Sequence, residues 1–246
     1  MPDRVSGAII AAGRGDRLRA ATGDRPKPLV EVGGETLIAR QVRLMLALGL
    51  DQVHVIINTE TARLMSAAKI ELPRAVRLKV ADTPNSMESL LRLGESIPAG
   101  LFLLATVDTV LPEDEFRHFF ERASAATAVR AGDGFDGALG VVEWQGDQKP
   151  LFVEVAVNST IVRFGDEKLD GESPTLVTAG VYLFATRIFE YSRAARARRL
   201  GALRQYLALL IEHRMRFAAV PMTDVIDVDE GADLALARAS VARRGR

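Results

Sequence analysis

The chain of 246 residues contains no cysteine, which excludes disulfide bonds and thiolate metal sites. It has no excess of charge of either sign, because 32 Lys and Arg residues balance 32 Asp and Glu residues. We therefore expect neither a nucleic acid nor an anionic membrane as a partner. No apolar run approaches the roughly 18 residues that span a bilayer, and no apolar targeting segment precedes the first expected strand. These absences predict a cytoplasmic protein.

The residues that are present favour an α/β fold. Strand and helix patterns alternate in the first half, where buried strands are expected at Val5–Ala12, Gln52–Asn58, Val76–Ala81 and Leu101–Val107. Such alternation favours parallel strands joined by helices. We predict a single domain over residues 1–246, with a Rossmann-like, three-layer α/β/α architecture and a mostly parallel central sheet. The shorter strand patterns of the second half predict a small inserted β region at about 133–175.

A glycine-rich turn follows the first expected strand and carries several cationic side chains. Gly13 and Gly15 let the backbone turn sharply and approach a ligand closely. Successive backbone N–H groups in such a turn bind anions, and Arg in particular grips phosphate oxygens through two N–H groups. The positive charges come from Arg14, Arg17 and Lys27. The stretch therefore predicts a polyphosphate site.

The spacing of this turn separates it from two common phosphate loops. A dinucleotide fingerprint needs glycine at position 18, which is Leu18, and no Gly-Lys-Ser/Thr of a P-loop is present. Pro26 and Pro28 bias the residues before them away from helix, so Lys27 is expected in a stiff, extended segment.

The segments AAGRGDRL and PKPLVEVGGETLI together resemble the signature of the nucleotidyltransferase family. That family comprises the sugar-1-phosphate nucleotidylyltransferases and the related alcohol-phosphate cytidylyltransferases. The resemblance implies transfer of a nucleoside monophosphate from an NTP to a small phosphorylated acceptor, with release of pyrophosphate and with Mg²⁺ as cofactor. It implies that Arg17 contacts the departing phosphates and that Lys27 contacts the α-phosphate and the acceptor phosphate. The cradle for the nucleotide would then be formed by Ala11, Ala12, Gly13, Arg14 and Gly15.

Two carboxylates are candidate metal ligands. Asp108 follows the apolar run FLLATV, so it should emerge at the carboxyl end of a strand, where open parallel sheets bind ligands. The resemblance assigns a second ligand to Asp227 within VIDVDEGADLALA. Asp229 is a rival on the same strand face and is also a candidate N-cap of the last helix. Two carboxylates with phosphate oxygens and waters suit Mg²⁺.

The start of the helix expected at Ser86–Gly94 is a further candidate for nucleotide binding. Asn85, Ser86 and Ser89 stand where sugar nucleotidylyltransferases usually show Gly-Thr-Ala, and the pattern is more similar to the alcohol-phosphate enzymes. Exposed N–H groups at a helix start bind a base or phosphate. The alternative is that Asn85 is a plain N-cap with Glu88 in the first turn, and this role is compatible with binding.

Three residues in the second half are candidates for binding the acceptor. Thr178 and Gly180 belong to TAGVY, which resembles the acceptor-lining Asn-Ala-Gly-Ile-Tyr of the family. Glu154 lies on a strand of the expected insertion, which the resemblance makes the acceptor-binding region, and a solvent-facing strand residue is an equally good explanation for it.

Two other functions stay open at this stage. Departures from the family pattern at Asn85, Val107 and Thr178 would suit a nucleotide-binding sensor or scaffold without catalysis. A nucleotide-sugar-using glycosyltransferase would carry Asp-x-Asp after the strand, where this chain has Asp108-Thr109-Val110. The sequence leaves the base, the acceptor and a possible homo-oligomer undetermined.

Overall fold

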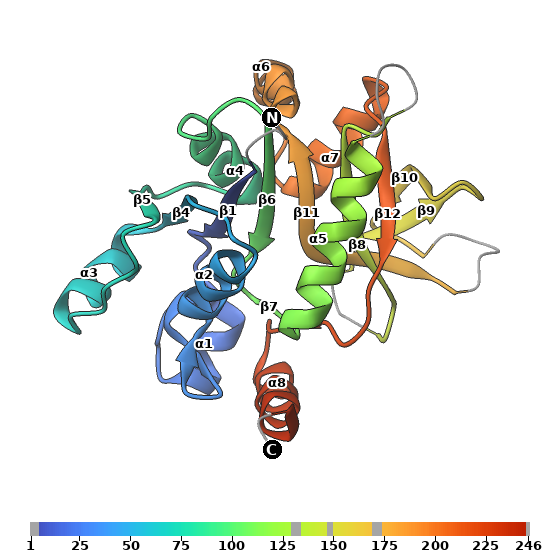
Figure 1. Ribbon diagram of the computed structural model, residues 1–246. Coiled ribbons are helices and arrows are strands. Elements are labelled where there is room, and N and C mark those ends of the chain that lie inside the picture. Colours follow the sequence, from blue (N-terminus) through green and yellow to red (C-terminus); the bar gives the residue numbers. More distant parts are fainter. Residues whose placement is uncertain (1–4, 129–133, 147–149, 169–173, 245–246) are drawn as a thin grey trace.

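The computed structural model describes residues 5–128, 134–146, 150–168 and 174–244. Within them, nine strands form one sheet in the order β5-β4-β1-β6-β11-β8-β12-β10-β9 (Figure 1). Their bounds are β1 (Ser6–Ala11), β4 (Val53–Ile57), β5 (Val76–Val80), β6 (Leu101–Thr106), β8 (Gly137–Glu143), β9 (Phe152–Val155), β10 (Thr160–Gly165), β11 (Leu176–Ala185) and β12 (Phe217–Pro221). Two short ladders lie outside this sheet: β2 (Glu31–Val32) with β3 (Glu35–Thr36), and β7 (Thr109–Val110) with β13 (Ile226–Asp227).

Helices connect these strands. The α-helices are α1 (Asp16–Thr22), α2 (Leu37–Ala47), α3 (Thr59–Ala67), α4 (Ser86–Gly94), α5 (Glu113–Thr127), α6 (Ser192–Ala197), α7 (Leu203–Glu212) and α8 (Gly231–Arg244). Two 3-10 helices, η1 (Lys27–Leu29) and η2 (Thr186–Tyr191), complete the described elements. None of the helices in the described residues combines the length and the apolar character needed to cross a membrane.

Helices cover both faces of the sheet and give it two apolar cores. On one face, buried residues of α2 and α5 pack with alternate side chains of the central strands, such as Ile9 and Leu103. On the other face, α4 and α7 pack with the intervening side chains, such as Ala8 and Leu104. Because successive strand residues point to opposite faces, continuous apolar runs such as FLLAT in β6 serve both cores at once.

The sheet is mixed, so the prediction of a mostly parallel, Rossmann-like sheet is wrong. Strands β5, β4, β1 and β6 run parallel, as the βαβ pattern predicts. Beyond β6, however, β11 runs antiparallel to both β6 and β8, and β10 runs antiparallel to β12 and β9. Among the described strands on this side, β8 and β12 run parallel. The short connection between β9 and β10 suits their antiparallel pairing, because a parallel pair needs a longer crossover.

The described strands of the expected insertion, β8, β9 and β10, belong to the same sheet as the rest. Its residues 133, 147–149 and 169–173 lie outside the described residues. An acceptor-binding role for this region stays a prediction.

Near the glycine-rich turn, one local expectation needs correction. The helix α1 follows directly on Gly15, which has a left-handed backbone (φ +64°) and caps it. Lys27 is not extended but begins the 3-10 helix η1, with Pro28 in the first turn. Proline is tolerated there because the N–H that it lacks would have no helical partner.

Candidate active site

Asp108 lies at the carboxyl edge of the parallel strands. Strand β6 ends at Thr106, and the pairing continues as the Val107 N–H donates to the carbonyl oxygen of Ile10 on β1 (3.1 Å). The glycine-rich turn after β1 and the carboxylate of Asp108 therefore leave the sheet at the same edge. This is the edge where open parallel sheets bind ligands.

Asp227 reaches that edge through the ladder between β7 and β13. The ladder pairs Thr109 with Asp227 in antiparallel register. It is extended by the N–H of Val228, which donates to the carbonyl oxygen of Asp108 (3.0 Å). Two acids separated by more than one hundred positions thus meet because each borders the same two-residue ladder. Figure 1 shows β7 below β6, with α8 beyond it.

The ammonium group of Lys27 lies between carboxylates. Its Nζ donates to Oδ2 of Asp108 (2.9 Å) and to Oδ1 of Asp229 (2.6 Å). Gly15 packs against its stem, since a Cβ at Gly15 would lie 2.8 Å from the Cβ of Lys27. The two halves of the sequence motif are therefore in direct contact.

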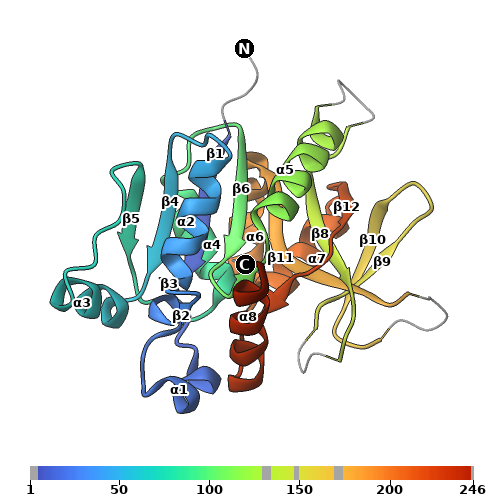
Figure 2. The ribbon, with the colours of Figure 1, turned by 60° about the horizontal axis from the view of Figure 1, so that its bottom comes forward.

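Arg17 approaches the same group from the first turn of α1. Its Nη2 lies 2.5 Å from Oδ2 of Asp229, and its Nη1 lies 3.8 Å from a carboxylate oxygen of Glu230. Helix α1 packs beside α8, and Figure 2 shows both helices below the sheet. This packing brings Arg17 into reach of a residue more than two hundred positions away.

The carboxylates of Asp108, Asp227 and Asp229 form one cluster. Each offers an oxygen, and these oxygens lie within 4.8 Å of one another. Burial opposes the charge of Lys27, but Asp108 and Asp229 outweigh it and raise the pKa of the lysine above its ordinary value. Burial likewise opposes the charge of Asp229, but Lys27 and then Arg17 lower the pKa of that carboxyl below its ordinary value. These shifts keep Lys27 and Asp229 charged at neutral pH.

Asp229 has a different place from the N-cap that its position suggests. The carboxylate of Asp233 accepts from the N–H groups of Asp229 (3.0 Å) and Glu230 (2.8 Å), so Asp233 caps this turn. The side chain of Asp229 instead binds Lys27 and Arg17. Asp229 is the member of the cluster that the sequence ranks second, and the alternation Asp-x-Asp is the signal that found it.

The cradle expected at residues 11–15 combines a buried and an open part. Ala11 and Ala12 are buried at the end of β1, whereas a Cβ at Gly13 would have no neighbour within 4 Å and Arg14 is exposed. The amide of Asn58 donates to the carbonyl oxygen of Ala12 (3.2 Å) and caps α3 through the Thr61 N–H (2.8 Å). Sequence reasoning missed Asn58, although a buried strand followed at once by Asn is a recognisable signal.

At the start of α4, the side chains of the three candidate residues have protein partners. Asn85 accepts from the N–H of Glu88 (2.9 Å), which is the N-cap geometry. The hydroxyl of Ser86 accepts from the N–H of Leu203 (3.0 Å) on α7. Ser89 is buried and donates to the carbonyl oxygen of Asn85 (3.1 Å). These contacts give all three residues a structural role, and their part in nucleotide binding stays a prediction.

The acceptor candidates lie on the antiparallel side of the sheet. Glu154 on β9 pairs with Arg163 on β10 (2.8 Å). Thr178 on β11 forms a side-chain hydrogen bond with Tyr182, whose pKa burial raises to about 12. Gly180 lies between them at a break in the β11–β8 register, with a left-handed backbone (φ +72°).

Gly180 packs closely against the segment around Asp108 and leaves no open space for a ligand at its Cα. A Cβ there would lie 2.2 Å from Oγ1 of Thr109 and 2.7 Å from Oγ1 of Thr106. These two hydroxyls are hydrogen-bonded to each other (2.8 Å). Glycine is therefore needed where β11 touches the two threonines that flank Asp108.

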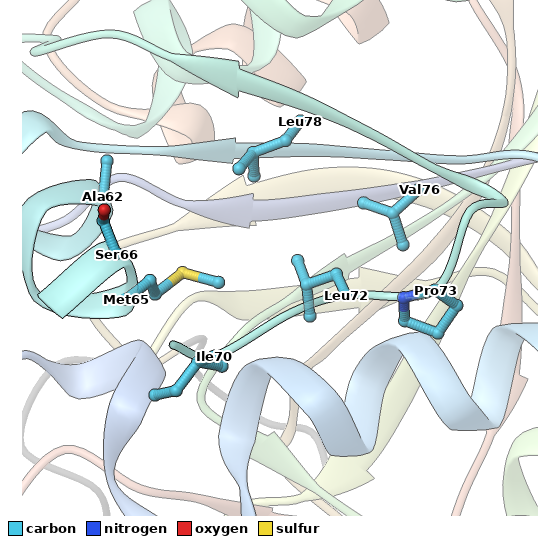
Figure 3. Close-up of a pocket in the computed structure, with 8 residues that line it drawn as sticks. All are labelled: Ala62, Met65, Ser66, Ile70, Leu72, Pro73, Val76 and Leu78. Carbon is cyan, nitrogen blue, oxygen red and sulfur yellow. The ribbon is translucent and has the colours of Figure 1, made fainter. Parts of the chain in front are cut away.

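An apolar hollow of about 330 Å³ lies at the other edge of the sheet, beside β5 and α3 (Figure 3). Its lining residues are Ala62, Met65, Ser66, Ile70, Leu72, Pro73, Val76 and Leu78. The lining carries no ionisable side chain, so no side-chain charge is available there for a phosphate or a metal ion.

Residues 7–214 match the family described as MobA-like NTP transferase domain. The chain belongs to this family. The match covers the glycine-rich turn, Lys27 and Asp108, and it favours nucleotidyl transfer over the glycosyltransferase alternative. The segment with Asp227 and Asp229 lies outside the matched residues, so the role of those acids depends on the geometry.

Two curated relatives share part of this chain. The bifunctional enzyme IspD/IspF of Clavibacter michiganensis subsp. michiganensis is 37% identical over an alignment of 134 residues that covers 52% of this chain and 31% of that protein. The bifunctional protein GlmU of Methanocaldococcus jannaschii is 24% identical over 184 residues, which are 74% of this chain and 40% of that protein. The chain thus spans less than half the length of these two relatives.

Solved structures show the same fold over the whole chain. The inositol-1-phosphate CTP transferase of T. maritima superposes with a TM-score of 0.75 at 17% identity, over 95% of this chain and 93% of that one. The CTP:phosphocholine cytidylyltransferase of Streptococcus pneumoniae gives a TM-score of 0.74 at 17% identity, over 97% and 99% of the two chains.

Proposed function

We propose that this protein transfers a nucleoside monophosphate from an NTP to a phosphorylated sugar or alcohol and releases pyrophosphate. One observation carries the proposal. Lys27 of the glycine-rich motif lies between Asp108 and Asp229, within a cluster of carboxylates at the carboxyl edge of the parallel strands. Family membership supplies the reaction class, and this cluster supplies the groups that it needs.

The reaction requires alignment and charge neutralisation more than proton transfer. An oxygen of the acceptor phosphate attacks the α-phosphorus of the NTP, the bond from that phosphorus to the bridging α–β oxygen breaks, and pyrophosphate leaves. A phosphate monoester is already largely anionic at neutral pH, because its second pKa is about 6. No side chain has to remove a proton, so a site without histidine is chemically sufficient.

Lys27 and Arg17 would bind the phosphates. An ammonium group has three N–H donors, and the contacts to Asp108 and Asp229 use two of them. The third would meet the α-phosphate and then the acceptor phosphate. Arg17 is partly exposed, and its planar guanidinium suits the departing β- and γ-phosphates. The backbone of residues 11–15 would cradle the nucleotide.

The carboxylates fit a divalent cation, and we propose Mg²⁺. All three donors are hard carboxylate oxygens close enough to share one ion. Asp108 and Asp227 would be the direct ligands, and Asp229 would hold Lys27 and Arg17 beside them. When bound, Mg²⁺ would neutralise charge on the NTP phosphates.

We place the acceptor on the antiparallel side, near Glu154, Thr178 and Gly180. The base and ribose would lie toward Asn85, Ser86 and Ser89, through backbone groups at the start of α4. The structural neighbours named above act on inositol phosphate and phosphocholine, which favours an alcohol or sugar phosphate here. We place the reaction in the cytoplasm, where nucleoside triphosphates are available.

The test is a pyrophosphate-release screen of the four common NTPs against sugar 1-phosphates, phosphocholine and inositol phosphate. We expect at least one pair to give turnover that Asp108→Asn lowers by roughly two orders of magnitude. Asp114→Asn, which changes an exposed aspartate at the start of α5, is the matched control and should keep the rate. Tight NTP binding without pyrophosphate release in any pair would instead support a nucleotide sensor.

A further inference from the structure

Helix α2 inserts two polar side chains behind the site. Gln41 and Arg40 are both buried, and both point to the backbone of the segment that follows Asp108. The amide of Gln41 donates to the carbonyl oxygen of Thr109. Arg40 donates through Nη2 to the carbonyl oxygen of Leu111 (3.1 Å). Two buried side chains of α2 therefore form hydrogen bonds with the backbone of β7 and of the residue that follows it.

Stability alone gives a poor reason for an amide at position 41. Gln41 is fully buried, and within the described residues its Oε1 has no hydrogen-bond partner. A buried acceptor without a partner is destabilising, whereas an apolar side chain of similar size would fill the same space without that penalty. The single useful contact of this amide is the one to Thr109.

Thr109 is the residue through which the carboxylates are aligned. It follows Asp108 directly and pairs with Asp227 in the β7–β13 ladder. That ladder is two residues long, and such a short pair has little stability of its own. A fixed carbonyl at Thr109 holds one side of the ladder, so the spacing between the two carboxylates is held as well.

The same helix also fixes the position of Lys27. Its first residue, Leu37, donates its N–H to the carbonyl oxygen of Val30 (2.9 Å), directly after η1. The start of α2 is thus tied to the segment that carries Lys27, and Gln41, one turn later, is tied to the segment that carries Asp108. Helix α2 therefore forms hydrogen bonds with the segment that carries Lys27 and with the segment that carries Asp108.

We propose that Gln41 is a positioning residue that holds β7 so that Asp108 and Asp227 keep the spacing required for a divalent cation. The inference rests on the proposed function. It gives α2, which supplies none of the three carboxylates, an indirect role in metal binding. Gln41 would act through the carbonyl oxygen of Thr109 and not as a ligand of the metal.

The test compares Gln41→Met with Arg40→Met. Both changes remove a buried donor to a backbone carbonyl from the same helix and leave an apolar chain of similar length. Only Gln41 contacts the residue paired with Asp227. We expect Gln41→Met to weaken Mn²⁺ binding, measured by electron paramagnetic resonance without nucleotide, about tenfold, as loss of an outer-shell contact does. The Mg²⁺ concentration for half-maximal rate should rise to a similar extent, with the acceptor KM nearly unchanged.

Amide exchange supplies a readout independent of activity. The N–H of Val228, which donates to Asp108, should exchange faster in Gln41→Met and at the wild-type rate in Arg40→Met. Equal Mn²⁺ binding and equal Val228 exchange in wild type and Gln41→Met would overturn the proposal, whatever the change in Tm. If Gln41→Met does not fold, Gln41→Asn, which keeps the amide but withdraws it from Thr109, should give the same direction. If the wild type releases no pyrophosphate with any substrate pair, the proposed function is refuted. The amide-exchange and Mn²⁺ measurements would still decide whether Gln41 positions the carboxylates.

Discussion

The two sides of the central sheet differ in strand direction, and their strands differ in burial. In the parallel half, β1 and β4 are buried along their whole lengths. In the antiparallel half, β10 alternates little and is mostly half-buried or exposed, and β9 is buried only at its start. The central strands are thus covered on both faces, whereas the outer strands, β5 on one side and β9 and β10 on the other, remain partly accessible.

We propose that this difference separates the residues of the reaction from those that bind the acceptor. The ionic cluster of Lys27, Asp108 and Asp229 lies at the carboxyl edge of the buried half, where its spacing is fixed by packed strands. Glu154 lies on an accessible strand, and its pairing with Arg163 is exposed. We infer that the reaction groups depend on the parallel half and that acceptor choice depends on the other. The following predictions test that division.

The largest effect is expected from Lys27→Ala, which removes the cation at the centre of the site. We expect the rate of pyrophosphate release to fall by about two to three orders of magnitude, because one preorganised electrostatic contact is lost. Arg25→Ala is the matched control, since Arg25 lies two residues away and pairs with Glu31 at the surface. Similar losses of rate in both variants would show that the activity depends on the conformation of this loop and not on the ammonium group of Lys27.

Gly180→Ala tests the contact between the two halves. The new Cβ would clash with Thr109 and Thr106 on a left-handed backbone, so we expect the free energy of unfolding to fall by about 2 kcal/mol or more. Gly49→Ala is the control, because Gly49 also has a positive φ (+81°) but no atom within 4 Å of the added Cβ. Urea unfolding of both variants separates backbone strain from the clash. Equal losses of unfolding free energy in the two variants would mean that β11 shifts away from Thr106 and Thr109 and so avoids the clash.

Local sequence patterns predicted the positions of strands better than they predicted which strands pair and in which direction. The apolar runs located β1, β4 and β6, and FLLATV placed Asp108 at the end of a strand. Strand direction beyond β6 is not encoded in such runs, because a short apolar strand reads the same in parallel and antiparallel sheets. The sheet therefore came out mixed.

Within the candidate site, the resemblance points to Arg17, Lys27, Asp108 and Asp227, and the structure brings these four residues into one cluster with Asp229. Their functional roles stay predictions. The pairing of Asp229 with Lys27 depends on the packing of α8 beside α1, which no local pattern reveals. Gln41 belongs to the apolar face of an amphipathic helix in the sequence. Its contact with Thr109 joins residues 68 positions apart, and only the tertiary structure shows it.

A smaller effect is expected from Glu154→Gln, which keeps the shape and removes the charge. If Glu154 binds a hydroxyl or ammonium group of the acceptor, the acceptor KM should rise about tenfold, in line with the loss of one charged hydrogen bond. The KM for the NTP should not change. Glu143→Gln, on the exposed end of β8, is the control. A rise in the NTP constant instead would place Glu154 on the nucleotide side and break the division between the two halves.

The smallest effect concerns stability at mildly acidic pH and arises in the buried half. His54 on β4 is buried, its Nδ1 lies 3.3 Å from the hydroxyl of Ser96, and burial, with a smaller contribution from Arg77, lowers its pKa below the ordinary 6.5. Below about pH 6.5 the unfolded chain binds a proton that the folded protein refuses, so stability should fall as pH falls from there to the lower folded pKa. Above pH 7 both states are neutral at this residue, and it contributes no slope. Urea midpoints between pH 8 and pH 5 should therefore decline more in wild type than in His54→Gln, and parallel declines would assign the acid sensitivity to the carboxylates instead.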